Sequence, residues 1–131
     1  MKVVDVVAAI IVRDGKVLAT QRGYGDLEGG WEFPGGKIER GESPEQALVR
    51  EIREELEASI DVGARLITVE HDYEKFHLSM RCYVCSLASE HVVLTEHHAA
   101  RWVGAADIDD LAWLPADIMV VEAIKQSGIV R

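Results

Sequence analysis

The chain has 131 residues, 48% of them hydrophobic, and carries 23 acidic against 14 basic residues. This length suits one domain with its own core, expected over residues 1–131, and the apolar content excludes a disordered protein. The net charge of −9 disfavours nucleic acid and anionic membranes as partners. We expect the protein in the cytoplasm. Two cysteines are too few for a disulfide scaffold, and the sequence has neither an apolar run of membrane-spanning length nor a leader pattern.

Two strands joined by a tight turn are predicted near the start of the chain. Residues 6–12 form a continuous apolar, β-branched run, which is typical of a strand covered on both faces. Asp14-Gly15 is a strong hairpin signal, so residues 16–21 are predicted to return as the second strand. Arg22 then opens a glycine-rich loop, residues 23–30, which is either a mobile rim or a plain connector.

A glycine loop and a helix are predicted next, after a short strand at residues 31–33. Gly35 and Gly36 allow a close approach of the backbone to other groups. The helix start is well marked, because Ser43 is a good N-cap and Pro44 suits the first helical position. Gln46 completes a capping box, so we expect the helix to begin here.

The predicted helix gathers three carboxylates on one arc. Glu51, Glu54 and Glu55 project within roughly 100° of one another, because positions i, i+3 and i+4 share a helical face. Like charges at this spacing repel, and a bound cation removes that penalty. Oxygen ligands beside a glycine loop suit Mg²⁺. The neighbouring arc can be buried and consists of Leu48, Val49, Ile52 and Leu56.

A long antiparallel hairpin is predicted from residues 64–73 and 76–87, which both alternate between apolar and polar residues around a turn at Glu74-Lys75. Cys82 and Cys85 are an odd number of residues apart, so they are predicted on opposite faces of the sheet and not as a metal or redox pair. One face of the second strand is predicted to hold Phe76, Leu78, Met80, Cys82 and Val84.

The last third of the chain begins with a polar loop, residues 89–100. His97 and His98 in this loop are expected to be solvated, and the alternative is that they bind a softer metal. A short strand at residues 101–103 and a helical turn at 107–111 are predicted to follow. The closing helix is predicted from residue 116 or 117 to residue 126, ended by Gly128. Its packed residues are predicted to be Ile118, Val121 and Ile124.

The central stretch resembles the signature of the Nudix hydrolases, which is Gly, five residues, Glu, seven residues, Arg-Glu, an aliphatic, any residue, Glu-Glu, any residue, Gly and an aliphatic. The chain departs from this pattern at its end, where Glu57 replaces the glycine and Ala58 the larger aliphatic. That glycine normally ends the helix in a left-handed conformation, so we expect Glu57 to cost about 1 kcal/mol there. The positions that match are Gly36, Glu42, Arg50, Glu51, Ile52, Glu54 and Glu55.

The resemblance implies an α+β fold, the Nudix α/β/α sandwich, with a mixed β-sheet between the signature helix and the C-terminal helix. It also implies two or more Mg²⁺ ions, with Mn²⁺ as an alternative. Arg50 would orient Glu51, and either Glu51 or Glu96 would act as the general base. The implied catalytic residues are Arg50, Glu51, Glu54 and Glu96. The implied metal ligands are the Gly35 carbonyl, Glu51, Glu54, Glu55 and Glu96.

Four further residues are candidates for binding a substrate. By resemblance, Arg22 would contact phosphates, and Lys37 follows Gly36 closely enough to reach a phosphate bound at the metals. The alternative for each is an exposed side chain without a role in binding. Phe33 is either a core residue or a base-stacking one. Asp117 is either the N-cap of the last helix or, as in similar proteins, a residue that recognises the base.

The implied activity is Mg²⁺-dependent hydrolysis of normal, modified or oxidised (deoxy)nucleoside triphosphates to nucleoside monophosphate and pyrophosphate, with nucleotide pool sanitation as one role. The chain looks similar to both the 8-oxo-dGTP diphosphatase and the CTP pyrophosphohydrolase types. Alternatives are hydrolysis of nucleotide sugars or dinucleoside polyphosphates, a non-catalytic nucleotide-binding module, or an acidic cation-binding protein. The assembly expected is a monomer or a homodimer.

Overall fold

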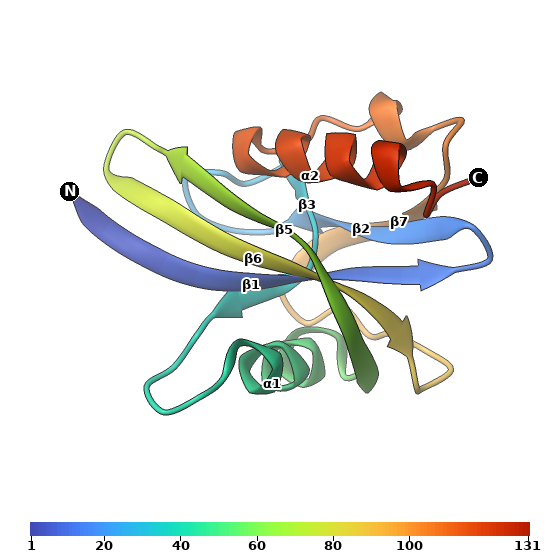
Figure 1. Ribbon diagram of the computed structural model, residues 1–131, viewed down its shortest axis with the longest axis horizontal. Helices are drawn as coiled ribbons and strands as arrows, with labels where there is room; N and C mark the ends of the chain where they lie inside the picture. The colour runs from blue at the N-terminus through green and yellow to red at the C-terminus, as the bar shows by residue number, and fades with distance from the viewer.

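The computed structural model describes residues 1–131 and shows a mixed β-sheet between two helices, the arrangement that the resemblance implied (Figure 1). No helix is both long enough and apolar enough to cross a membrane. The helices are α1 (Pro44–Leu56) and α2 (Pro115–Ser127), with a 3₁₀ turn, η1 (Ile108–Asp110). The strands are β1 (Lys2–Arg13), β2 (Lys16–Arg22), β3 (Trp31–Glu32), β4 (Gly35–Lys37), β5 (Ile60–Asp72), β6 (Phe76–Leu87) and β7 (His97–Val103).

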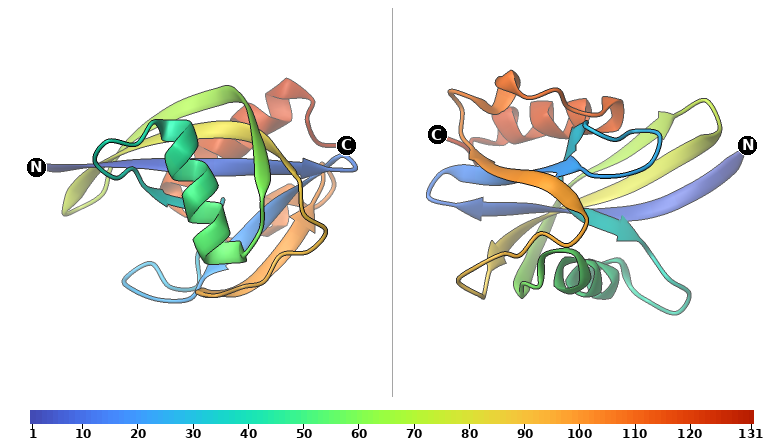
Figure 2. Two further views of the ribbon diagram at one scale, coloured as in Figure 1. Left: turned by 90° about the horizontal axis from the view of Figure 1, so that it is seen from below. Right: turned by 180° about the vertical axis from the view of Figure 1, so that it is seen from behind.

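The sheet is organised around β1. Its strands follow the order β3-β2-β1-β6-β5, with β4 added to β1 and β7 added to β2. Only β1 and β6 pair in parallel. The helix α1 covers one face and α2 the other (Figures 1 and 2), so both faces need apolar side chains.

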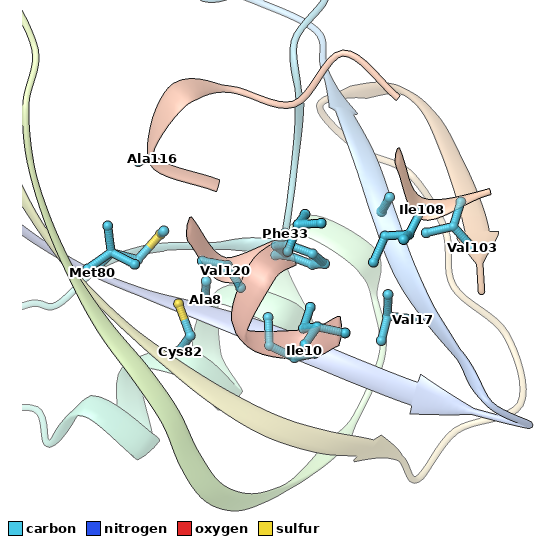
Figure 3. Packing of buried hydrophobic residues seen from close by; sticks show 14 of the residues in the cluster. Ala8, Ile10, Val17, Phe33, Met80, Cys82, Val103, Ile108, Ala116 and Val120 are labelled. Carbon is cyan, nitrogen blue, oxygen red and sulfur yellow. The ribbon is translucent and has the colours of Figure 1, made fainter. Parts of the chain in front are cut away.

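Side chains of β1 alternate between two hydrophobic cores, which confirms the prediction of a strand buried on both faces. Ala8 and Ile10 belong to the core beneath α2, where they pack with Val120 (Figure 3). Val7 and Ile11 belong to the core beneath α1. A strand with period-two side chains can serve two cores only if it lies between two layers.

The helix α1 begins as its sequence predicts, and it ends in the geometry that the signature glycine would give. Ser43 accepts a hydrogen bond from the Gln46 N–H at 3.1 Å and the Gln46 side chain returns one to the Ser43 N–H at 2.9 Å, completing the capping box. Glu57 takes the left-handed conformation, with φ 48° and ψ 39°, that glycine usually provides. Of the predicted apolar arc, Leu48, Ile52 and Leu56 are buried.

Two predicted strands are longer than expected. The strand β1 starts at Lys2, four residues before position 6, because its parallel pairing with β6 continues to Lys2 opposite Phe76. The strand β5 starts at Ile60 instead of residue 64, with irregular pairing between Val62 and Ile67. In the hairpin, Cys82 belongs to the α2 core and Cys85 to the α1 core, which confirms that they lie on opposite faces.

Three other predictions were wrong. Gly35–Lys37 is not a loop but the strand β4, and a Cβ at Gly35 would overlap the Val7 carbonyl of β1. The predicted polar loop ends early, since β7 begins at His97 and pairs with β2. Ile118 is exposed, because it lies on the outer face of α2, whereas Val121 and Ile124 are buried as expected.

Candidate active site

A cleft of about 820 Å³ brings together residues of β1, β4, β6, α1 and α2. Its volume lies within the range of small-molecule sites. The predicted site residues Arg50 and Glu54 are not part of its wall. Those that line it are Arg22, Phe33, Gly35, Lys37, Glu51, Glu55, Glu96 and Asp117. We call the region around Glu32, Glu51, Glu55 and Glu96 the acidic part, and the region around Phe33, Leu114 and Asp117 the apolar part.

The strand β4 places α1 so that Glu51 faces the cleft. A Cβ at Gly36 would overlap the carboxyl group of Glu51, so any larger residue would require this carboxyl group to move from its present position. The backbone pairs Gly36 with Val7 of β1, which fixes the distance between the strand and the helix. The two glycines therefore serve close packing, Gly35 against β1 and Gly36 against α1.

Arg50 holds the carboxylates around it in place. Its guanidinium donates to both carboxylate oxygens of Glu42 at 2.7 and 2.9 Å, to Glu51 at 2.8 Å and to the Lys37 carbonyl at 3.0 Å. These hydrogen bonds, chiefly the one to Glu42, raise the pKa of Arg50 above its ordinary value. Arg50 therefore holds the Glu51 side chain from outside the cleft, and Glu42 in turn holds Arg50. The catalytic role of Arg50 stays a prediction.

Glu54 is not brought to the cleft with Glu51 and Glu55. Its side chain is 60% exposed and accepts a hydrogen bond from Arg50 at 3.2 Å. The helical arc of about 100° is wide enough to separate the three carboxylates, because Arg50 draws one of them outward. The role of Glu54 as a metal ligand stays a prediction.

Glu55 is the most strongly perturbed carboxylate of the acidic part. Burial, the neighbouring charge of Glu51 and the charges of Glu32 and Glu96 all raise the pKa of Glu55 well above its usual range. Ionising all of the carboxyl groups in a partly buried cleft costs free energy through burial and mutual repulsion, and a cation bound between them reduces this cost. The carboxylates of the acidic part therefore repel one another, and a bound cation would relieve this repulsion.

Glu96 reaches the acidic part because the segment before it is bound to the end of α1. Thr95 donates its backbone N–H and its hydroxyl to the Glu55 carbonyl, at 3.1 and 2.9 Å. Val93 donates to the Leu56 carbonyl at 2.7 Å. These bonds satisfy carbonyls that a helix end leaves free. The segment lies beside α1 in both views of Figure 2.

His97 is not solvated, contrary to the sequence-based expectation. Its side chain is 4% exposed and lies between Glu32 and Glu55. His98, which follows it, is 52% exposed and contacts Glu28 at 3.1 Å, as expected for a rim residue. The difference arises because β7 begins at His97, and successive side chains of a strand point to opposite faces.

Glu32 and Tyr24 are cleft residues that the sequence analysis missed. Glu32 lies 3.4 Å from the Arg22 guanidinium, which also lies over the Tyr24 ring at 5.2 Å from its centroid. The sequence did hold a signal for Glu32, which lies between the aromatic residues Trp31 and Phe33. In a strand, its side chain points to the face opposite to theirs. Tyr24 had no comparable signal within its loop.

Asp117 belongs to the apolar part and is not the N-cap of α2. Leu114 is the N-cap, and Asp117 lies in the first turn with its side chain only 4% exposed. Its Oδ1 accepts a hydrogen bond from the Phe33 N–H at 3.1 Å. Burial raises the pKa of Asp117 to about 8. Phe33 itself is buried and stacks on Trp113 with ring centroids 4.7 Å apart, so it is a core residue that also lines the cleft.

The acidic part fits a hard divalent cation, although no three of the His, Cys, Asp and Glu side chains are arranged to hold a metal ion as they stand. Its donors are mainly carboxylate oxygens, which Mg²⁺ and Mn²⁺ prefer, and the crowding that raises the pKa of Glu55 is the repulsion that such an ion relieves. The residues that would hold the ion from within the cleft are Gly35, Glu51, Glu55 and Glu96.

The fold and the cleft define an α+β protein with a carboxylate-bearing helix beside a ligand cleft. A family profile described as "NUDIX domain" matches residues 6–123, so the chain belongs to the Nudix family. It is 41% identical over 126 residues to the CTP pyrophosphohydrolase of Escherichia coli (strain K12), covering 94% of this chain and 92% of that protein.

Two further similarities agree with this placement. The chain is 40% identical over 117 residues to the "Putative 8-oxo-dGTP diphosphatase 2" of Mycobacterium tuberculosis (strain CDC 1551 / Oshkosh), covering 86% of this chain and 81% of that protein. The solution structure of the E. coli ORF135 protein is similar with a TM-score of 0.82 at 36% identity, covering 96% of this chain and 91% of that one. The chain is thus related to pyrophosphohydrolases of nucleotides.

Proposed function

We propose that the protein hydrolyses (deoxy)nucleoside triphosphates, normal or modified, to nucleoside monophosphate and pyrophosphate with the help of Mg²⁺. The observation that carries this proposal is the continuity of the cleft, in which Glu51 and Glu55 share one cavity with the buried pair of Phe33 and Asp117. An acidic part alone would suit any cation. The attached apolar part, with one buried polar group, supports a ligand that has both phosphates and a base. The similarity to a CTP pyrophosphohydrolase and to a putative 8-oxo-dGTP diphosphatase supports the same substrate class.

The acidic part handles the phosphates in this proposal. Arg22 and Lys37 line the same cleft and offer positive charge to phosphate oxygens, in a protein whose net charge of −9 repels them. When bound, Mg²⁺ neutralises the phosphates, polarises the scissile bridge and lowers the pKa of the attacking water. Arg50 holds Glu51 toward the cleft, and Glu51 or Glu96 accepts the proton of that water.

The apolar part binds the base. Because burial raises the pKa of Asp117 to about 8, its carboxyl group is protonated near neutral pH. Its Oδ1 already accepts from the Phe33 N–H, and the other oxygen is left to donate to an acceptor on the edge of a base. Phe33 and Leu114 supply apolar walls beside it.

A pyrophosphate-release screen over unmodified, methylated and oxidised triphosphates with Mg²⁺ tests the proposal. We expect release from at least one triphosphate, and its loss in Glu51→Gln. Faster cleavage of nucleotide sugars or dinucleoside polyphosphates would move the protein to another substrate class. Binding of triphosphates without any release would instead make it a nucleotide-binding module.

The variant Asp117→Ala tests the assignment of the base pocket. We expect it to change the order of preferred triphosphates, because an uncompensated polar group in such a pocket discriminates by about 10-fold to 100-fold or more. The ratio of kcat/KM between the best and the next substrate should therefore fall further than kcat on the best one. Equal losses on all bases would contradict the assignment.

A further inference from the structure

His97 is a buried histidine held in place by its backbone. As the first residue of β7 it pairs with Arg22 of β2, at a register shift between Gln21 and Arg22. Two residues earlier, Thr95 is hydrogen-bonded to the Glu55 carbonyl at the end of α1. The backbone at His97 is therefore anchored on both sides, by the sheet and by α1.

The ring lies between two carboxylates, Glu32, which lies beside Arg22, and Glu55, which lies beside Glu51. Its Nε2 is 3.6 Å from Glu32 Oε2 and 3.7 Å from Glu55 Oε2. These distances are longer than hydrogen bonds, so the ring separates the two groups more than it binds them. Glu32 remains beside Arg22, 3.4 Å away, whereas Glu55 remains beside Glu51.

The opposite nitrogen of the ring has no partner. His97 Nδ1 is buried and makes no hydrogen bond, which makes it the only such side-chain atom among the buried ones. A buried polar atom without a partner destabilises a fold. An apolar side chain of similar size would avoid this cost, so stability of the core does not explain a histidine at this position.

We propose that His97 is a positioning residue, a polar wedge that keeps Glu55 turned toward Glu51 and the cation instead of toward Glu32 and Arg22. The inference rests on the proposed function, since it takes Glu55 as a ligand of the divalent ion. The wedge needs the volume of the ring and a nitrogen at its tip, where Nε2 faces both carboxylates. Without it, Arg22 is free to attract Glu55 as well as Glu32, which removes one carboxylate from the ion.

Binding of Mn²⁺ in the absence of nucleotide, followed by titration calorimetry, tests this role separately from hydrolysis. We expect His97→Ala to raise the Kd for Mn²⁺ by about 10-fold to 100-fold, the usual effect of losing a residue that orients a metal ligand. His97→Gln should restore most of the affinity, because its amide nitrogen reaches the position of Nε2. His97→Asn should not, since its amide reaches only the position of Nδ1.

His98→Gln is the matched control. The side chain of His98 follows His97 in the chain, is exposed and contacts Glu28. The Kd of this variant for Mn²⁺ should equal that of the unaltered protein. The melting temperature of each metal-free variant identifies any that fails to fold. Equal Mn²⁺ affinity in folded His97→Asn, His97→Gln and unaltered protein would overturn the wedge, as would absence of Mn²⁺ binding altogether.

Hydrolysis is measured on the same variants with saturating and limiting Mg²⁺. We expect the Mg²⁺ concentration for half-maximal pyrophosphate release to rise in His97→Ala more than the maximal rate falls. If the unaltered protein releases no pyrophosphate but the Mn²⁺ series behaves as expected, the proposed function fails and the positioning role stands. If release is normal and His97→Ala binds Mn²⁺ unchanged, the positioning role fails alone.

Discussion

The two parts of the cleft differ in how well their polar groups are satisfied. In the apolar part, Asp117 accepts from the Phe33 N–H and Phe33 stacks on Trp113. In the acidic part, burial and like charge raise the pKa of Glu55, and His97 Nδ1 has no hydrogen-bond partner. The apolar part is therefore already formed in the protein alone, whereas the acidic part carries electrostatic repulsion that a bound cation would relieve.

This difference has a physical consequence for stability and activity. Groups that repel one another destabilise the folded chain, so removing a charge there raises stability even when it removes function. Groups that are well bonded stabilise it, so removing one of them lowers stability. Removing a charge from the acidic part should thus raise stability, whereas removing the group of Asp117 that accepts from the Phe33 N–H should lower it.

The largest effect is expected for Glu55→Gln in the acidic part. Each 1.36 kcal/mol of lost transition-state stabilisation is a factor of ten, so we expect pyrophosphate release to fall about 100-fold or more. Because the pKa of Glu55 is raised, the folded protein at neutral pH must keep a proton that the unfolded chain releases. Glutamine avoids that penalty, so the melting temperature of the metal-free protein should rise.

The control for this experiment is Glu90→Gln, an exposed carboxylate outside the cleft, which should change neither quantity. Both variants are compared by differential scanning calorimetry with a chelator present and by pyrophosphate release with Mg²⁺. A lower melting temperature for Glu55→Gln would show that Glu55 makes stabilising contacts, and the contrast between the two parts would disappear.

A smaller effect, dependent on pH, is expected at Asp117. Its folded-state pKa of about 8 is above the ordinary value of 3.8, so the folded protein holds the proton more tightly than the unfolded chain. The stability from this carboxyl group is fully present below about pH 3.8 and is lost as the pH rises toward 8. Asp117→Asn keeps an acceptor for the Phe33 N–H without ionising, whereas Asp117→Ala leaves that N–H unpaired.

We therefore expect Asp117→Asn to gain in melting temperature relative to the unaltered protein as the pH rises. Between pH 5 and pH 8 the difference should grow by about 3 °C or more. Asp117→Ala should be less stable than Asp117→Asn at every pH, by about 1–3 kcal/mol. Thermal melts across this pH range check both differences. A difference between Asp117→Asn and the unaltered protein that does not change with pH would mean that Asp117 is ionised in the fold.

The smallest effect is expected at the C-terminal ends of the two helices. Glu57 ends α1 and Gly128 ends α2, both in the left-handed conformation, with φ of 48° and 76°. Glu57→Gly should stabilise the protein by up to about 1 kcal/mol, and Gly128→Ala should destabilise it by about the same amount. Chemical denaturation measures both. Equal signs for the two substitutions would show that packing, not backbone conformation, decides these positions.

Local features of the sequence predicted the start of the helix α1 and the presence of the strands β1, β2, β5 and β6. The start of α1 is fixed by contacts within one helical turn, made by Ser43, Pro44 and Gln46. The continuous apolar run of β1 predicts a strand that is buried on both faces. The strand ends were less predictable. β1 extends to Lys2 because β6 pairs with it, and β4 forms from glycines that carry no strand signal.

The sequence by itself determined the order of the elements, the Nudix signature and the presence of Arg50, Glu51 and Glu55 on one helix, because their spacing along a helix sets which side chains are neighbours. Only the tertiary structure decided that His97 is buried, that Glu32 joins the acidic part and that Asp117 bonds to Phe33. Those contacts join residues far apart in the chain, and the physical reason is that strand pairing and sheet packing, which no local pattern encodes, bring them together.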